Sequence, residues 1–216
     1  NRVLNIRCFS MLLLHQIGSH KIQKEIPDDP QLLLTNKRGG FFYWQDNPVS
    51  RYQGFYFRDG DKMYKTIAQI RLGVALAPKR IKNNFWNFEV ERSSGLTERF
   101  FMDPASDSLI YELNNSINFY LDLDCKEIFD NEVDGRFYDI SEEDGCVIIS
   151  YVKKKEDSTQ YDYFLAIAGN DYSWEKKGMW LEKKYSYDEQ RRDPPYERYV
   201  FSAIAFSISS MPSFMP

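Results

Sequence analysis

Short runs of apolar and aromatic residues alternate with turn-forming residues along most of this chain. Several runs alternate apolar and polar residues with the two-residue period of a strand. No long window has the periodicity of an amphipathic helix. The runs that we predict as strands span residues 41–44, 51–57, 63–72, 85–90, 96–102, 108–113, 117–123, 146–152, 161–168, 179–187 and 196–206.

The breaks between these runs contain Gly, Pro, Asn and Asp, which are the residues of tight turns. Many short strands at regular spacing are typical of a β-sandwich. We therefore predict an all-β fold, a large antiparallel β-sandwich of supersandwich type with little helix, over residues 25–207. Residues 1–24 form a poorly defined N-terminal segment in this prediction, and residues 208–216 form an irregular tail. Residues 153–157 are interpreted as a solvated hairpin loop and residues 185–195 as an exposed arm.

The composition is that of a globular protein with a large aromatic share. Of the 216 residues, 43% are hydrophobic and 28% are charged, which is enough apolar material to bury a core. The 15 tyrosines and 16 phenylalanines favour strands or a stacking surface. The net charge is −4 and no RNA-binding signature is present, and the apolar run at residues 8–14 is too short for a membrane span. We expect neither nucleic acid nor a membrane as a partner.

Three cysteines and two histidines limit the chemistry of the folded part. Cys8, Cys125 and Cys146 lie far apart without a CxxC spacing or a histidine partner, so we expect no metal site and no cofactor. Reduced, packed thiols suit a cytoplasmic protein. His15 and His20 both belong to the N-terminal segment. The predicted strands therefore contain no histidine base for a Ser-His-Asp or Cys-His mechanism.

The most informative segment spans residues 32–58 and reads LLLTNKRGGFFYWQDNPVSRYQGFYFR. An apolar run leads through a polar and basic stretch into tandem glycines, which permit positive φ and a close approach to the main chain. Two aromatic strands follow, separated by a turn with Asn and Pro. This alternation is typical of a sheet edge beside a ligand or a partner domain.

This order resembles the start of the N-terminal domain of the archaeal and bacterial type of glycogen debranching enzyme. Residues 34–40 match a Leu-Thr-Asn-Gly-x-Gly-Gly segment of that family, with Lys37 in place of its first Gly. Residues 47–54 match an Asn-x-Arg-Arg-Tyr-His-Gly segment, with Gln53 in place of His. Softer similarity in the later aromatic strands extends the resemblance over roughly residues 25–206.

The resemblance implies a non-catalytic N-terminal accessory domain of an amylo-α-1,6-glucosidase-type glycoside hydrolase. In that family both catalytic carboxylates belong to a helical (α/α)-barrel domain that follows in the chain, and these 216 residues do not include it. The chain is therefore expected to have no catalytic residues and to be inactive alone on glycogen. The implied partners are the helical catalytic domain of the same polypeptide and a glycogen-like α-glucan, to which this domain contributes a loop.

Polar and aromatic residues around the tandem glycines are the candidates for glucan contact. Aromatic rings can lie against the C–H face of a sugar, and Asn and Arg donate directional hydrogen bonds to hydroxyls. We expect the loop at residues 37–51 to lie at one rim of the sandwich, with Arg38, Trp44, Asn47 and Arg51 partly exposed. The predicted substrate-binding residues are Asn36, Arg38, Trp44, Asn47, Arg51, Tyr52 and Gln53.

Each candidate has a plainer interpretation that the sequence leaves open. Arg51 could hold a sugar hydroxyl or an interdomain carboxylate, and it could equally form an ordinary surface salt bridge. Trp44 could stack on a sugar or fill the core. For Trp86 we favour the core; Trp174 and Trp180 carry the same pair of interpretations, and Tyr43 and Tyr52 are further stacking candidates.

An acidic stretch at residues 122–134 offers several oxygen ligands of the kind that calcium prefers. Its spacing does not follow the EF-hand loop, and we interpret it as solvated surface charge. The residues concerned are Asp122, Asp124, Glu127, Asp130, Glu132 and Asp134.

Three functions remain open from the sequence. The first is a domain that docks on a helical catalytic domain and lends it a loop. The second is a free-standing carbohydrate-binding module, and the third is a structural sandwich without a ligand. An exposed apolar face beside the conserved-type loops would favour the first, and an exposed row of Trp and Tyr without such a face would favour the second.

Overall fold

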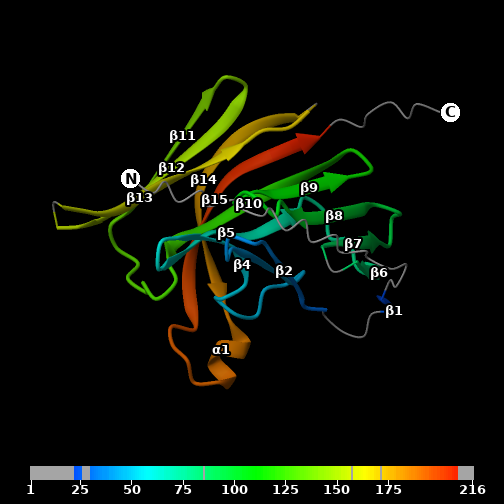
Figure 1. The fold of residues 1–216 in the computed structure, drawn as a ribbon, viewed down its shortest axis with the longest axis horizontal. Coiled ribbons are helices and arrows are strands. Elements are labelled where there is room, and N and C mark those ends of the chain that lie inside the picture. The colour runs from blue at the N-terminus through cyan, green and yellow to red at the C-terminus, as the bar shows by residue number, and fades with distance from the viewer. Residues whose placement is uncertain (1–21, 26–29, 85, 157, 171, 209–216) are drawn as a thin grey trace, which may run out of the picture.

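The computed structural model describes residues 22–25, 30–84, 86–156, 158–170 and 172–208, and most of them belong to antiparallel strands (Figure 1). The strands form three sheets. The seven-stranded sheet has the order β14 (Tyr172–Lys184), β15 (Glu197–Ile208), β10 (Ile117–Glu127), β5 (Lys62–Leu72), β4 (Gly54–Asp59), β3 (Phe41–Trp44) and β2 (Leu32–Thr35). The five-stranded sheet has the order β1 (Ile22–Glu25), β6 (Pro78–Asn83), β7 (Asn87–Arg92), β8 (Thr97–Met102) and β9 (Leu109–Leu113). The three-stranded sheet contains β11 (Arg136–Glu143), β12 (Cys146–Lys155) and β13 (Ser158–Ile167), and α1 (Ser186–Gln190) is a short helix.

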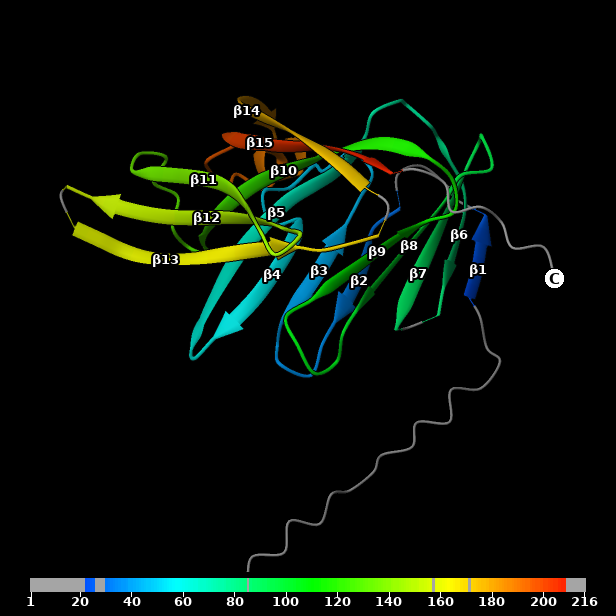
Figure 2. The same ribbon diagram turned by 90° about the horizontal axis from the view of Figure 1, so that it is seen from above.

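The two smaller sheets follow one another along the seven-stranded sheet (Figure 2). The ring of Phe42 in β3 lies 5.5 Å from that of Phe100 in β8, and Tyr138 in β11 stacks on Phe201 in β15 at 4.5 Å. Both contacts belong to one continuous apolar core. The predicted all-β sandwich with little helix is therefore confirmed.

Tyrosine hydroxyls, and not a strand ladder, attach the three-stranded sheet to the large one. The pairing of β10 with β5 shifts register around Leu123, which frees main-chain groups of both strands. These groups need partners because they are buried. The bonds run from the Cys125 N–H to the Tyr138 hydroxyl (3.1 Å), from the Glu127 N–H to the Tyr161 hydroxyl (3.1 Å) and from the Tyr163 hydroxyl to the Lys65 carbonyl (2.5 Å).

One predicted loop is wrong in part and another is wrong. Lys154, Lys155 and Glu156 are exposed at the hairpin between β12 and β13, as predicted. Residues 153–155 continue β12, and Lys153 is buried with its ammonium donating to the carbonyls of Glu132 (2.9 Å) and Asp134 (2.6 Å). Residue 157 lies outside the described residues. The segment at 185–195 is no exposed arm, because it contains α1 and buries Tyr185 and Asp188.

Four strands, β1, β2, β6 and β11, are absent from the predicted list, and the bounds of another differ. In β6 only Ile81 is buried, and in β11 only Arg136 is buried, so neither strand has an apolar run to mark it. The strand predicted at 179–187 is β14, which begins at Tyr172 and ends at Lys184. The predicted domain boundaries at 24/25 and 207/208 are wrong, because they fall inside β1 and β15. The remainder of the predicted N-terminal segment and tail, residues 1–21 and 209–216, lies outside the described residues.

Strand β10 is buried on both faces, and the two faces differ in kind. Leu121, Leu123 and Cys125 belong to the apolar core. Because successive side chains point to opposite faces of a strand, Asp122 and Asp124 point away from that core. Both carboxylates are fully buried, so their interpretation as solvated charge is wrong.

Asp124 is the centre of a buried ionic cluster. Its carboxylate lies 3.3 Å from the Lys65 ammonium, 3.1 Å from the Arg198 guanidinium and 3.4 Å from that of Arg136. Burial alone would raise the pKa of Asp124, but Lys65, Arg198, Lys126 and Arg136 outweigh it and hold the pKa well below its usual range. One carboxylate thus neutralises several buried cations.

Lys126 is the least compensated cation of this cluster. Its ammonium donates to the Asn131 carboxamide oxygen at 3.2 Å. Burial lowers the pKa of Lys126 to about 7, against the attraction of Asp124 and with the repulsion of Arg198 and Lys65. The ionic cluster therefore contains a lysine that loses its proton near neutrality.

Replacing Asp124 by Asn should destabilise the fold strongly. Among the described residues, Asp124 is the carboxylate that forms ion pairs with Lys65, Arg136 and Arg198, and breaking a buried ion pair from one side costs about 3–5 kcal/mol. Urea unfolding followed by circular dichroism measures the loss. The control is Asp139→Asn at an exposed position of β11, and equal midpoints for the two variants would contradict the assigned role.

The free energy of unfolding should rise with pH because of Lys126. In the unfolded chain a lysine has a pKa of about 10.4, so above pH ~7 the unfolded state binds more protons at this position than the folded state. Between pH ~7 and ~8.5 the wild-type protein should therefore gain stability relative to Lys126→Met, by at most about 1.4 kcal/mol per pH unit. Lys155→Met, at an exposed position, is the control, and its free energy of unfolding should change with pH as that of the wild type does. The same pH dependence for Lys126→Met would refute the assignment.

Candidate functional site: the tyrosine rim

The structure separates the predicted substrate-binding residues into two places. Asn36 and Arg38 lie in the turn between β2 and β3, whereas residues 45–53 form the loop between β3 and β4. These two connections lie at opposite ends of β3, whose four residues span about 13 Å. The prediction that residues 37–51 occupy one rim is therefore wrong.

The turn between β2 and β3 is organised by the side chain of Asn36. Its carboxamide oxygen accepts hydrogen bonds from the N–H groups of Arg38 (3.0 Å) and Gly40 (2.8 Å). A Cβ on Gly40 would lie 2.8 Å from the Tyr56 carbonyl oxygen, so the close approach that this glycine permits is internal to the sandwich. Arg38 is exposed and forms a 3.0 Å ion pair with Asp107.

Gln53 and Trp44, at the loop between β3 and β4, have structural roles. The buried Gln53 carboxamide oxygen accepts hydrogen bonds from the N–H groups of Val49 (2.6 Å) and Ser50 (2.9 Å), and its nitrogen donates to Gln45. Trp44 is 5% exposed and packs against aromatic rings of the five-stranded sheet. Its predicted partial exposure is wrong, and its indole belongs to the core.

Arg51 ties this loop to α1. Its guanidinium lies 3.3 Å from the Asp188 carboxylate and 2.7 Å from that of Asp193. Asp188 also accepts hydrogen bonds from the Ser50 hydroxyl (2.7 Å) and the Arg51 N–H (2.8 Å). Arg51 is 1% exposed, so its predicted exposure and its interpretation as a surface salt bridge are both wrong. The Arg51 carbonyl in turn accepts a 2.8 Å hydrogen bond from Lys65, which connects the loop to the buried ionic cluster.

These buried contacts hold a set of exposed and partly exposed groups, which we call the tyrosine rim: Tyr43, Asn47, Tyr52, Tyr187 and Arg191. The Arg191 guanidinium lies 5.0 Å from the ring centre of Tyr187 and 6.0 Å from that of Tyr52. Burial and the neighbouring Tyr187 raise the pKa of Tyr43, against the effect of Arg191. Asn47 is exposed, as predicted, and Tyr187 is 45% exposed.

Sequence reasoning missed two members of the tyrosine rim. Tyr187 and Arg191 lie in the segment taken for an exposed arm. The density of aromatic and charged residues at 185–191 was the available signal. Nothing local in the sequence places that segment beside Val49, whose carbonyl accepts the Tyr187 N–H at 3.0 Å.

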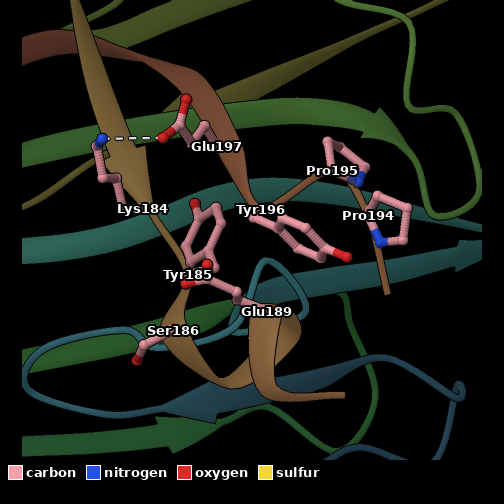
Figure 3. Close-up of a pocket in the computed structure, with 8 residues that line it drawn as sticks. All are labelled: Lys184, Tyr185, Ser186, Glu189, Pro194, Pro195, Tyr196 and Glu197. Atoms are coloured by element: carbon pink, nitrogen blue, oxygen red, sulfur yellow. Dashed lines mark ion pairs between the residues drawn. The ribbon is translucent and has the colours of Figure 1, made fainter. Parts of the chain in front are cut away.

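A polar depression of about 490 Å³ lies on α1 and the segment that follows it (Figure 3). Tyr185, Tyr196 and the cis-linked Pro194-Pro195 form its less polar part. Lys184 and Glu197 form a 2.9 Å ion pair at its edge. The carboxylates of Glu189 and Glu197 are exposed, so neither has the apolar surroundings that tune a catalytic acid.

The remaining aromatic and thiol candidates do not join the tyrosine rim. Trp86 is half exposed, so the core interpretation is wrong for it, and Trp180 lies under the Arg136 guanidinium at 4.7 Å. Trp174 donates to Glu142 at 3.0 Å. Burial raises the pKa of the Cys125 thiol to about 12, which makes it unreactive. Cys8, His15 and His20 lie outside the described residues.

Truncating Gln53 should destabilise the loop between β3 and β4. The change Gln53→Ala leaves the N–H groups of Val49 and Ser50 without an acceptor, at a cost of about 1–3 kcal/mol for each buried group left unpaired. Thermal unfolding measures this loss, with Gln160→Ala at an exposed position of β13 as the control. If Gln53→Ala and Gln160→Ala have the same unfolding temperature, Gln53 does not hold the loop.

Groups of acidic, cysteine and histidine residues arranged to hold a metal ion are absent from the described part of the chain. The helical residues described here include no segment long and apolar enough to cross a membrane. Comparisons of this chain with protein families, with curated proteins and with solved structures find no match.

Proposed function

We propose that this chain is a non-catalytic accessory domain of a glycogen-debranching-type α-glucosidase, which contacts an α-glucan through the tyrosine rim. In this proposal it packs on a helical catalytic domain of the same polypeptide, and that domain supplies the reacting carboxylates. The resemblance of residues 34–54 supports the family, and the chemistry of the rim supports the ligand.

The observation that carries the proposal is the assembly of the tyrosine rim from two distant segments. Tyr43, Asn47 and Tyr52 come from β3 and the loop after it, whereas Tyr187 and Arg191 come from α1 and its end. The buried bonds between Arg51 and Asp188 hold the two segments together. A binding site gains affinity when its groups are ordered before the ligand arrives.

The groups of the rim suit a sugar chain. Phenol rings offer flat apolar faces with a polar tip, and the Asn47 carboxamide and Arg191 guanidinium offer directional donors for hydroxyl groups. In the proposal, Asn47 and Tyr52 touch the glucan, whereas Trp44, Arg51 and Gln53 position them. Asn36 and Arg38 lie at the other end of β3 and have no part in this glucan contact.

A free-standing carbohydrate-binding module is the second candidate, because the same tyrosines of the rim would serve it. The two candidates differ in what the gene encodes after this segment. A helical barrel in the same reading frame favours the accessory domain, and its absence favours the free-standing module. A structural sandwich without a ligand gives no reason for the exposed Tyr187 beside Arg191.

The wild-type chain should bind maltoheptaose, and the tyrosine rim should carry the binding. We expect Tyr187→Ala and Arg191→Ala each to weaken binding about tenfold, which corresponds to about 1.4 kcal/mol. Two-dimensional NMR titration measures both affinity and folding. Phe137→Ala, an exposed aromatic residue on β11, is the control and should bind as the wild type does. Equal affinities for all three variants would reject the rim, and absence of any perturbation in the wild type would reject glucan binding by this domain.

A further inference from the structure

An apolar groove of about 490 Å³ separates the two smaller sheets. One wall is formed by β9 and the other by β13, which approach each other in Figure 2. The floor belongs to the seven-stranded sheet, and its side chains are apolar. They include Phe55, Ile67, Ile70, Phe119, Leu121 and Phe206.

Both walls of this groove are strand edges. Among the described residues β9 pairs only with β8, and β13 pairs only with β12. Each strand therefore turns a row of main-chain N–H and C=O groups away from its own sheet. Such an edge is a template for another strand.

The half of β13 that lines the groove lacks the features that discourage strand pairing. Soluble proteins protect exposed edges with charges, prolines or bulges. The half of β13 that lines the groove reads Phe-Leu-Ala-Ile and contains neither a charge nor a proline. Phe164 is 68% exposed in this half. By contrast β14, which forms an edge of the large sheet, carries four lysines among its 13 residues.

We propose that this groove binds an extended peptide segment of a partner protein, which adds a strand to the edge of β13. Alternate side chains of such a strand, about 6.8 Å apart, face the apolar floor, and the others face solvent. Strand addition of this kind combines main-chain hydrogen bonds with pockets for alternate side chains. The proposal is independent of the glucan contact at the tyrosine rim.

The charges of the two edges define the partner further. The sequences of β9 and β13 contain Glu112 and Asp162 and no lysine or arginine. Glu112 is already engaged by Arg99 at 3.0 Å, whereas Asp162 is exposed on β13 beyond the groove. The bound segment is therefore apolar at alternate positions and carries a basic residue where it passes Asp162.

A synthetic peptide of alternating valine and threonine with a lysine at each end tests this site. It should bind the full chain in a fluorescence-anisotropy titration and slow the hydrogen exchange of β13 amides. A peptide of the same sequence with alternate amides N-methylated should bind at least about tenfold more weakly, because it cannot donate to a strand edge. Equal binding of both peptides would overturn strand addition.

The matched variants are Phe164→Lys in the groove and Phe137→Lys on β11, both at exposed positions. Phe164→Lys should weaken peptide binding at least about tenfold, and Phe137→Lys should leave it unchanged. Binding of an apolar dye in the groove without binding of the peptide would replace the proposal with a small-molecule site. Maltoheptaose binding should be unaffected by Phe164→Lys. The peptide titration therefore tests the groove, and the maltoheptaose titration tests the tyrosine rim.

Discussion

The organisation of this sandwich depends on one buried carboxylate, that of Asp124. Its charge compensates guanidinium and ammonium groups from β5, β11 and β15, and its side chain points away from the apolar core. A buried cation without a partner costs several kcal/mol. The packing of these three strands therefore depends on the position of the Asp124 carboxylate. Through Lys65 the same cluster holds the carbonyl of Arg51, and through Arg51 it fixes the approach of α1. The exposed chemistry of the tyrosine rim is thus set by electrostatics beneath it.

The fold class followed from the sequence because turn residues and β-formers repeat along the chain. That signal is local, and it located strands such as β3, β8 and β10 well. It failed for β6 and β11, since a strand that buries a single residue carries no apolar pattern. It also failed for Asp122, Asp124 and Lys153. A charged side chain is normally solvated. Only partners from distant strands offset the free-energy cost of burying it.

The candidate site was half accessible to sequence reasoning. The segment at residues 47–53 was identified from its resemblance and its polar content, and the structure gives it a defined role at the end of β3. Which of its residues face solvent depends on contacts about 140 positions away, such as that between Arg51 and Asp188. Arg51 and Gln53 therefore turned inward against expectation, and Tyr187 entered the site from a segment that had no assigned role.

The attachment of the three-stranded sheet by tyrosine hydroxyls has a mechanical consequence. No ladder joins β11, β12 and β13 to the other strands described, so this sheet can lift away while every main-chain pairing of the larger sheet stays intact. Lifting would break the three hydroxyl bonds and the contacts of Arg136 with Asp124 and the Tyr199 carbonyl, and it would expose apolar side chains of the core. The groove beside β13 then lies between two cooperative units. A ligand bound in this groove determines whether the sandwich unfolds under force or heat in one step or in two.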